Sequence, residues 1–237
     1  MAFIRPFEPK DTEDCKFIAC KQCRATLPPS LASSPACVAM APYLWTLQFT
    51  HLFPEHCFVL DDGSGRAVGY VIGTPDVFAL EEMYPRYVEE VLGSQQGRRD
   101  VPPPEQMERL EEWWVEGGEG GKRVNERCLA QTAYSVKWLV LEGVEGKREL
   151  VEGWRGMLHI DLLEGWQRRG FGREMIRRFV ERVEGVKGWE KGYDYGRGIQ
   201  LGVAGENKGV VRFYEGVGFR IYPGGEKEGN VWMVRDL

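Results

Sequence analysis

A glycine turn between two apolar segments carries the clearest chemical signal in this sequence. Gly170 and Gly172 interrupt a basic stretch, and apolar residues recur after it at helical spacing: Met175, Ile176, Phe179, Val180 and Val183. A helix that begins at such a turn directs free backbone N–H groups and the positive end of its dipole toward it. The glycines let a phosphate approach the backbone closely, and three arginines add positive charge: Arg168, Arg169 and Arg173. The pattern predicts a pyrophosphate-binding turn.

Two common phosphate-binding motifs do not fit this turn. A Rossmann motif needs a third glycine where Met175 stands, and a P-loop needs Gly-Lys-Ser/Thr, which is absent here. The pattern that remains is Gln/Arg-x-x-Gly-x-Gly/Ala, which the segment from Gln167 to Gly172 matches. The alternative interpretation is an ordinary strand-to-helix turn that binds nothing.

A second motif follows downstream. The segment from Gln200 to Val203 is typical of a strand, and a short helical stretch with a tyrosine comes after it. Asn207 suits the N-cap of that helix, because its side chain accepts hydrogen bonds from free backbone N–H groups. Tyr214 falls on the same helix, and Gly218 suits the left-handed position that ends it. Taken alone, Tyr214 is better explained as a half-buried packing residue with a solvated hydroxyl.

The two motifs, in this order, resemble those of the GNAT superfamily of acetyltransferases. The resemblance implies an α/β (α+β) GNAT fold with a mixed, mostly antiparallel twisted sheet and helices on both faces. It also implies a splay between the fourth and fifth strands, and acetyl-CoA as cofactor. The first half of the chain is similar to the acetyltransferase-like domain of O-GlcNAcase and its free-standing microbial relatives, through the Tyr43 region, His56–Asp62, Gly69–Val77 and Leu158–Leu163.

Two positions depart from those free-standing relatives. Glu164 and Gly205 stand where the relatives usually carry proline, beside the expected cofactor path. The animal O-GlcNAcase domain lacks the glycine turn that this chain keeps, which favours acetyl-CoA binding here. No glycosidase region accompanies the domain, so sugar hydrolysis is not expected.

The resemblance assigns roles to individual residues. Tyr214 is the expected proton donor to the departing CoA thiolate. Asp161 is the first candidate for the base that deprotonates the amine, and Asp76 is the second. Asp161 and Asp76 are also candidates to contact the acceptor, although local hydrogen bonding for Asp161 and turn capping for Asp76 are alternatives. His159 is expected to be structural, and no metal site is expected. The expected cofactor contacts are Leu162, Leu163, Gln167, Arg168, Arg169, Gly170, Phe171, Gly172, Arg173, Asn207 and Tyr214.

Bulk properties narrow the class of protein. The chain has 237 residues, of which 43% are hydrophobic, and a formal net charge of −5. We expect a single domain with its own core, no general nucleic-acid binding, and no membrane-spanning segment. The six cysteines lack zinc spacing, so reduced thiols in a cytoplasmic or nuclear protein are expected. The protein is expected to be a monomer or a homodimer.

Local patterns predict the main elements. A helix is expected from Asp11 to about Arg24, and Cys57–Gly73 indicates two strands around an Asp-Asp-Gly turn. Residues 93–155 are expected to be an insertion between the third and fourth strands. Within it we expect a helix from Glu105 to Val115, with Trp113 and Trp114 docked on its own domain or on a second subunit, and a strand from Lys137 to Val144.

These observations predict an acetyl-CoA-dependent N-acetyltransferase that transfers acetyl directly to an amine of a small molecule or a protein. The alternative is a module that keeps the fold but has weak catalysis or none. The sequence does not identify the acceptor.

Overall fold

A computed structural model of the chain describes residues 1–26, 29–32, 34–118, 121–142, 145–188, 192–204, 209–227 and 230–237. Its centre is a seven-stranded sheet in the order β1-β2-β3-β6-β7-β9-β8. Neighbouring strands are antiparallel except β6 and β7, which are parallel. The strands are β1 (Phe3–Pro6), β2 (Phe58–Asp61), β3 (Ala67–Thr74), β6 (Gly156–Leu162), β7 (Gly198–Ala204), β8 (Arg220–Lys227) and β9 (Asn230–Asp236).

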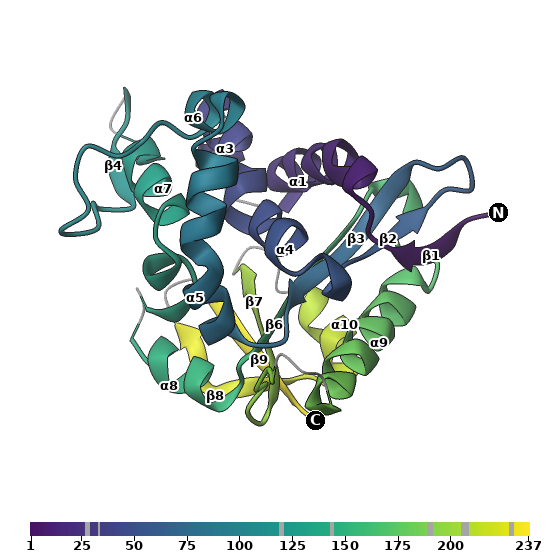
Figure 1. Cartoon of the computed structure of the whole chain (residues 1–237). Helices are drawn as coiled ribbons and strands as arrows, with labels where there is room; N and C mark the ends of the chain where they lie inside the picture. Colours follow the sequence, from purple (N-terminus) through teal and green to yellow (C-terminus); the bar gives the residue numbers. More distant parts are fainter. Residues whose placement is uncertain are drawn as a thin grey trace.

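Helices cover both faces of this sheet, as expected (Figure 1). One face carries a layer formed by α1 (Thr12–Thr26), α2 (Pro29–Ala32), α3 (Pro35–Trp45), α4 (Leu47–Leu52), α5 (Val77–Tyr87), α6 (Gln95–Asp100) and α7 (Glu126–Ala133). The opposite face carries α9 (Phe171–Glu184) and the short α10 (Val211–Glu215). Smaller helical pieces are η1 (Pro9–Asp11), η2 (Pro54–His56), η3 (Val88–Leu92), η5 (Lys137–Leu141), α8 (Lys147–Gly153), η6 (Glu164–Trp166) and η7 (Gly185–Gly188).

The helix predicted after the glycine turn is α9, and its apolar stripe is buried as its spacing requires. Phe179 lies against β3 at Gly73, where a Cβ atom would stand 2.7 Å from the Phe179 ring and 2.0 Å from the Met157 carbonyl oxygen. Only glycine therefore permits this close approach of helix and sheet. The five predicted stripe residues are all buried: Met175, Ile176, Phe179, Val180 and Val183.

The sheet splays between its fourth and fifth strands, as the resemblance implied. β6 pairs with β7 only at Gly156 with Ile199 and at Met157 with Gln200. Beyond Met157, β6 continues to Leu162 without pairing to β7. On its other edge it stays paired with β3 as far as Leu162, which lies opposite Gly69. One edge of β6 is therefore left facing the gap that opens toward β7.

Two local predictions from the first half of the chain are confirmed. The first helix is α1, and the Asp-Asp-Gly segment joins β2 and β3 into an antiparallel hairpin. Its turn is stabilised by Asp61, whose side chain accepts hydrogen bonds from the backbone N–H groups of Gly63 and Gly65.

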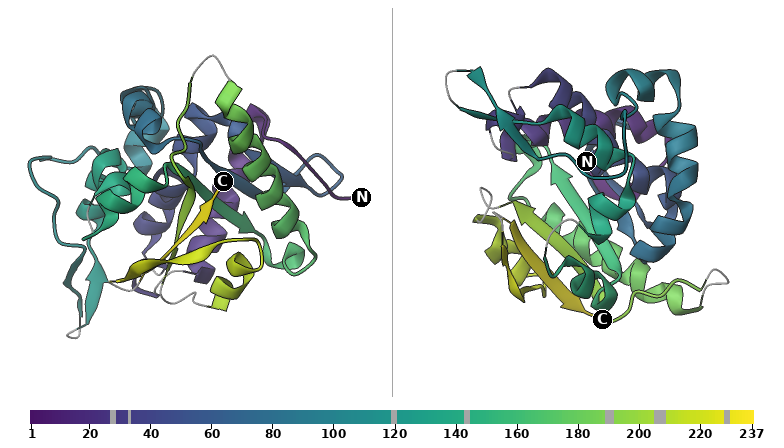
Figure 2. Two further views of the ribbon diagram at one scale, coloured as in Figure 1. Left: turned by 90° about the horizontal axis from the view of Figure 1, so that it is seen from below. Right: turned by 90° about the vertical axis from the view of Figure 1, so that its left-hand side faces the viewer.

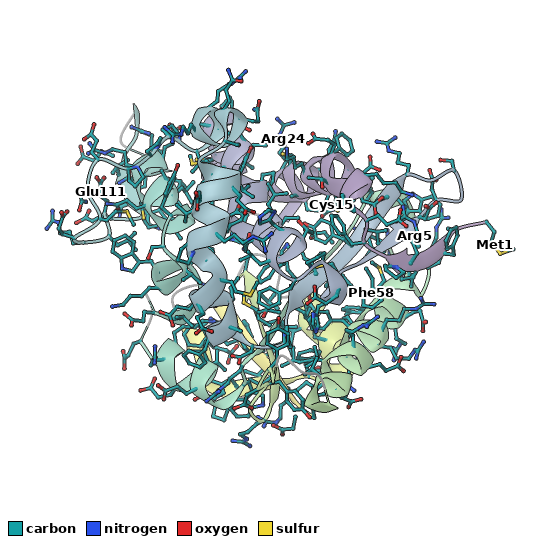
Figure 3. All side chains as sticks on the ribbon, viewed as in Figure 1. Met1, Arg5, Cys15, Arg24, Phe58 and Glu111 are labelled. Carbon is teal, nitrogen blue, oxygen red and sulfur yellow. The ribbon has the colours of Figure 1, made fainter. Side chains whose placement is uncertain are left out.

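The expected helix from Glu105 to Val115 is wrong. The chain from Val101 to Trp113 has no helix, and a small hairpin of β4 (Trp114–Glu116) and β5 (Lys122–Val124) follows it. The hairpin projects from the helical layer (Figure 2), and Glu111 beside it lies at the edge of the molecule (Figure 3). Trp113 and Trp114 are 36% and 38% exposed, so neither is fully docked on its own domain, and docking on a second subunit stays a prediction. Charged periodicity without a continuous apolar stripe is insufficient to hold a helix.

The expected strand from Lys137 to Val144 is also wrong. Lys137–Leu141 forms a π-helical turn, and residues 143–144 lie outside the described residues. Val140 and Leu141 are buried in the core under the helical layer. A short apolar run buries equally well in a strand or a helix, so its pattern did not distinguish them.

Candidate functional site

The free edge of β6 presents the backbone of Leu162 to the gap. The N–H of Leu163 donates to the Val68 carbonyl of β3, at 3.0 Å. Because backbone groups alternate along a strand, the N–H and carbonyl of Leu162 point away from β3, toward the gap. The Leu163 N–H is therefore already used within the sheet, and only Leu162 of this expected pair directs its N–H to an approaching chain.

The Leu162 carbonyl is held by two side-chain amides. Gln22 of α1 donates to it at 2.7 Å, and Gln167 of the glycine turn donates at 2.8 Å. These bonds join α1, the end of β6 and the turn at one atom. Gln167 was expected to contact cofactor, whereas nothing in the sequence pointed to Gln22.

The glycine turn has the geometry of an anion site at the start of α9. Gly170 is the N-cap residue with φ of +87°, and an added Cβ atom there would meet nothing within 4 Å. Arg168 has φ of 59°, which is uncommon for a residue with a side chain. Since glycine provides no capping side chain, the first N–H groups of α9 remain directed at the turn: Phe171, Gly172 and Arg173.

The three arginines of the turn are arranged differently from one another. Arg168 is exposed, and the Arg169 guanidinium lies 5.2 Å from the centre of the Trp166 ring. Arg173 donates to the Gly216 carbonyl at 2.7 Å and so connects α9 to the end of α10. Arg168 and Arg169 are therefore better placed than Arg173 to contact an anion directly.

A polar network occupies the face of β6 that lies under the helical layer. Asp161 Oδ2 accepts a hydrogen bond from the Tyr70 hydroxyl at 2.6 Å and lies 3.0 Å from His159 Nε2. Thr46 Oγ1 lies 3.2 Å from the same tyrosine hydroxyl. Burial and the Asp161 charge hold the pKa of Tyr70 well above its usual value, so this phenol stays protonated and donates.

The imidazole of His159 is the accessible end of this network. Its side chain is 37% exposed, compared with 15% for Asp161, and Tyr70 is fully buried. Neutral histidine carries one proton, so a tautomer that donates from Nε2 to Asp161 leaves Nδ1 as an acceptor. His159 is therefore placed to take a proton, which differs from the structural role expected for it.

Tyr214 lies on α10, as the second motif predicted. Its ring packs against Phe213 and Phe219 with centroids 5.3 and 6.0 Å away, and the residue is half-buried. Burial, and then the negative charge of Asp161, raise the pKa of Tyr214 above its usual value. The electrostatic influence of Asp161 links these two expected catalytic residues across the site.

Two other expected residues are not brought to this network. Asp76 caps α5 by accepting from the Phe78 N–H at 2.9 Å, and its second oxygen accepts from the Asp194 N–H at 3.3 Å. The structure thus assigns Asp76 the capping role, beyond the end of β3 that pairs with Met157. This agrees with the capping alternative, and contact of Asp76 with the acceptor stays a prediction. Asn207 lies outside the described residues.

Within the described part of the chain, no cluster of three or more metal-binding side chains is present. Likewise, none of the described helices has the length and apolar character needed to cross a membrane.

Solved structures with the same arrangement identify the fold. SsHAT is 24% identical, with 99% of this chain and 98% of that chain covered at a TM-score of 0.71. PH1933 from Pyrococcus horikoshii OT3 is 13% identical, with 100% and 99% covered at a TM-score of 0.51. The structure of yncA from Salmonella typhimurium, which holds its cofactor acetyl-CoA, is 10% identical, with 100% and 94% covered at a TM-score of 0.50.

No protein-family model and no curated protein matches the sequence. The strand order, the splay after Met157 and the structural matches together show that the chain has the GNAT fold.

Proposed function

We propose that this protein is an acetyl-CoA-dependent N-acetyltransferase that transfers acetyl directly to an amine. One observation carries the proposal: the free edge of β6 leads from the His159–Asp161 network to the glycine turn that begins α9. An extended ligand along that edge would have one end at the polar network and an anionic end at the helix N-terminus.

The cofactor would be held by backbone groups more than by side chains. The first N–H groups of α9 would bind the pyrophosphate, with Arg168 and Arg169 adding positive charge. The pantetheine arm would run beside Leu162, whose N–H faces the gap. Acetyl-CoA supplies the acetyl thioester, and the chain's own residues position it and move the protons.

The acceptor amine must be unprotonated to attack. We assign its proton to Nδ1 of His159, with Asp161 orienting the imidazole and stabilising its positive charge. Asp161 itself, the base expected from the sequence, is the alternative, because both of its described side-chain hydrogen bonds use Oδ2 and neither uses Oδ1. Either way the amine nitrogen bonds to the acetyl carbon, and the carbon–sulfur bond breaks.

The departing thiolate needs a proton. Because burial and Asp161 raise the pKa of Tyr214, its hydroxyl stays protonated at neutral pH and is available to donate. A donor that acts only on the leaving group affects turnover more than cofactor affinity.

Calorimetric titration with acetyl-CoA tests this proposal. We expect one site per chain, and competition by free CoA, which shares the pyrophosphate and pantetheine. Failure of acetyl-CoA to bind would overturn the proposal.

A binding module without catalysis is the second candidate. The observation that favours it is that Asp161 Oδ2 is already engaged by the Tyr70 hydroxyl and by His159 Nε2, which a purely structural network also explains. Such a module would bind acetyl-CoA or CoA but release no CoA when amines are added.

A further inference from the structure

A half-buried lysine lies on the same face of the sheet as the His159–Asp161 network. Lys147, the first residue of α8, donates from Nζ to Gln200 Oε1 of β7 at 3.2 Å. Its Nζ also lies 5.3 Å from the centre of the Trp232 ring. Gln200 is fully buried, at the last paired position before β6 and β7 diverge.

The hydrogen-bonding capacity of this pair is incompletely used. Gln200 Nε2 is buried and has no hydrogen-bond partner among the described residues. Lys147 likewise forms no ion pair within the described parts of the chain, and the ammonium keeps donors beyond the one used by Gln200. Burial lowers the pKa of Lys147 to about 8, so the amine is still largely protonated at neutral pH.

Buried donors of this kind carry a cost unless an acceptor satisfies them. An unpaired buried amide such as that of Gln200 loses its hydrogen bonds to water, and an ammonium that has lost part of its water shell gains from an opposite charge. A carboxylate fits this pair, because its two oxygens accept from an ammonium and an amide together and its charge opposes that of lysine.

The pair is within reach of the amine-deprotonating groups. In a parallel ladder, paired residues direct side chains to the same face, so Gln200 shares the face of Met157, and therefore of His159 and Asp161. Gln200 pairs with Met157 on the neighbouring strand, and His159 lies two residues further along β6. The Cα atoms of His159 and Gln200 are therefore about 8 Å apart. A small molecule spans such a distance.

We propose that Lys147 and Gln200 form a carboxylate-binding subsite, so that the acceptor is a small amine that also carries a carboxylate. The proposal rests on the acetyltransferase function proposed above and names its substrate class. The carboxylate accepts from Lys147 Nζ and Gln200 Nε2, while the amine is directed to His159.

Matched acceptors test the subsite. CoA release is measured with linear amino carboxylates, from β-alanine to 6-aminohexanoate, and with alkylamines of the same chain length. At the best length we expect kcat/KM at least about tenfold higher for the amino carboxylate, since an acceptor without the group leaves buried donors unpaired.

Two variants test whether this subsite causes the preference for the amino carboxylate. Lys147→Met keeps an apolar chain over Trp232 but removes the ammonium, and Gln200→Leu removes the amide. Each should bring the ratio of kcat/KM values, amino carboxylate over alkylamine, toward one. Lys137→Met is the control, because Lys137 is exposed and pairs with Glu142 outside the subsite; it should keep the wild-type ratio.

Equilibrium binding provides a second measurement that needs no turnover. By NMR titration, the amino carboxylate preferred in the assay, or 4-aminobutyrate if no turnover occurs, should bind wild type at least about tenfold more tightly than it binds the folded Lys147→Met protein. If wild type and Lys147→Met have the same kcat/KM ratio and the same affinity for the amino carboxylate, the subsite is overturned and the acetyltransferase function is unaffected. A loss of acetyl-CoA affinity in Lys147→Met would also overturn it, because the donors would then serve the cofactor. Absence of acetyl-CoA binding in wild type would instead overturn the proposed function.

Discussion

The two faces of β6 differ in what they contribute to the molecule. Leu158, Ile160 and Leu162 point toward α9 and pack in its apolar core. His159 and Asp161 alternate with them and point toward the helical layer, where they join a hydrogen-bonded network. One face therefore holds the strand in place, and the other carries the groups to which we assign proton transfer. We expect substitutions on the two faces to separate stability from chemistry.

Asp161→Asn should have the largest effect. Asparagine keeps the shape and can still accept from Tyr70, but it cannot stabilise a protonated His159 or take a proton itself. We expect the rate of acetyl transfer to fall by about 10³-fold, within the usual range for acid–base groups. The free energy of unfolding should change little, and Asp62→Asn in the exposed hairpin turn should change neither. An unchanged rate would remove the network from the reaction.

Leu158→Ala probes the opposite face. Leu158 is 3% exposed, so the shortened side chain leaves a cavity against α9 and should lower the free energy of unfolding by about 2–4 kcal/mol. Urea denaturation measures this loss. Turnover per folded molecule should stay close to wild type; a rate loss as large as that of Asp161→Asn would contradict the division between the faces.

Tyr214→Phe tests the proton donor on the α9 side of the sheet. We expect turnover to fall by about 10²-fold with little change in acetyl-CoA affinity, because only the departing thiolate needs the hydroxyl. Steady-state rates and calorimetry separate the two quantities. Tyr134→Phe, on the helical layer, is the control, and equal rates for all three proteins would exclude Tyr214 as donor.

Gly170→Val tests the glycine turn that begins α9. The left-handed φ of Gly170 is strained for valine, and the added side chain would occupy the space proposed for the pyrophosphate. We expect acetyl-CoA affinity to fall at least about tenfold. Gly65→Val imposes similar strain in the β2–β3 turn, also with open space around it, and should preserve affinity. Normal binding by the Gly170 variant would mean that the site is elsewhere.

Lys147→Met should have the smallest effect, and it should raise the free energy of unfolding rather than lower it. The folded pKa of Lys147 is about 8, below its usual 10.5, so the unfolded chain holds this proton more tightly. Folding therefore carries a penalty that is complete below about pH 8 and disappears as pH rises toward about 10.5. We expect the variant to be more stable by about 1 kcal/mol near neutral pH, with the advantage lost near pH 10. A destabilised variant at neutral pH would contradict the pKa depression.

The parts of the site that depend on local sequence were predictable. Gly170 and the stripe of α9 follow from turn chemistry and helical spacing, and the place of Tyr214 follows from the second motif. These features need only neighbouring residues to be recognised, and the structure places them on the predicted elements.

The parts that depend on register or packing were not predictable. Tyr70 reaches Asp161 because β3 and β6 pair these two residues, and no spacing along the chain indicates that register. Gln200 and Lys147 meet through packing of α8 on β7, again without a motif. The Glu105–Val115 and Lys137–Val144 errors arose in a segment where tertiary contacts, rather than local pattern, decide the backbone.

Rapid-mixing measurement of CoA release tests the central proposal most directly. The protein, in excess over acetyl-CoA, is mixed first without an amine and then with β-alanine or, in parallel, propylamine. Direct transfer predicts no CoA release before an amine is present, and then one CoA and one acetylated amine formed together for each acetyl-CoA bound. Release of CoA before amine addition would contradict direct transfer, and bound acetyl-CoA that releases no CoA with either amine would favour the binding module.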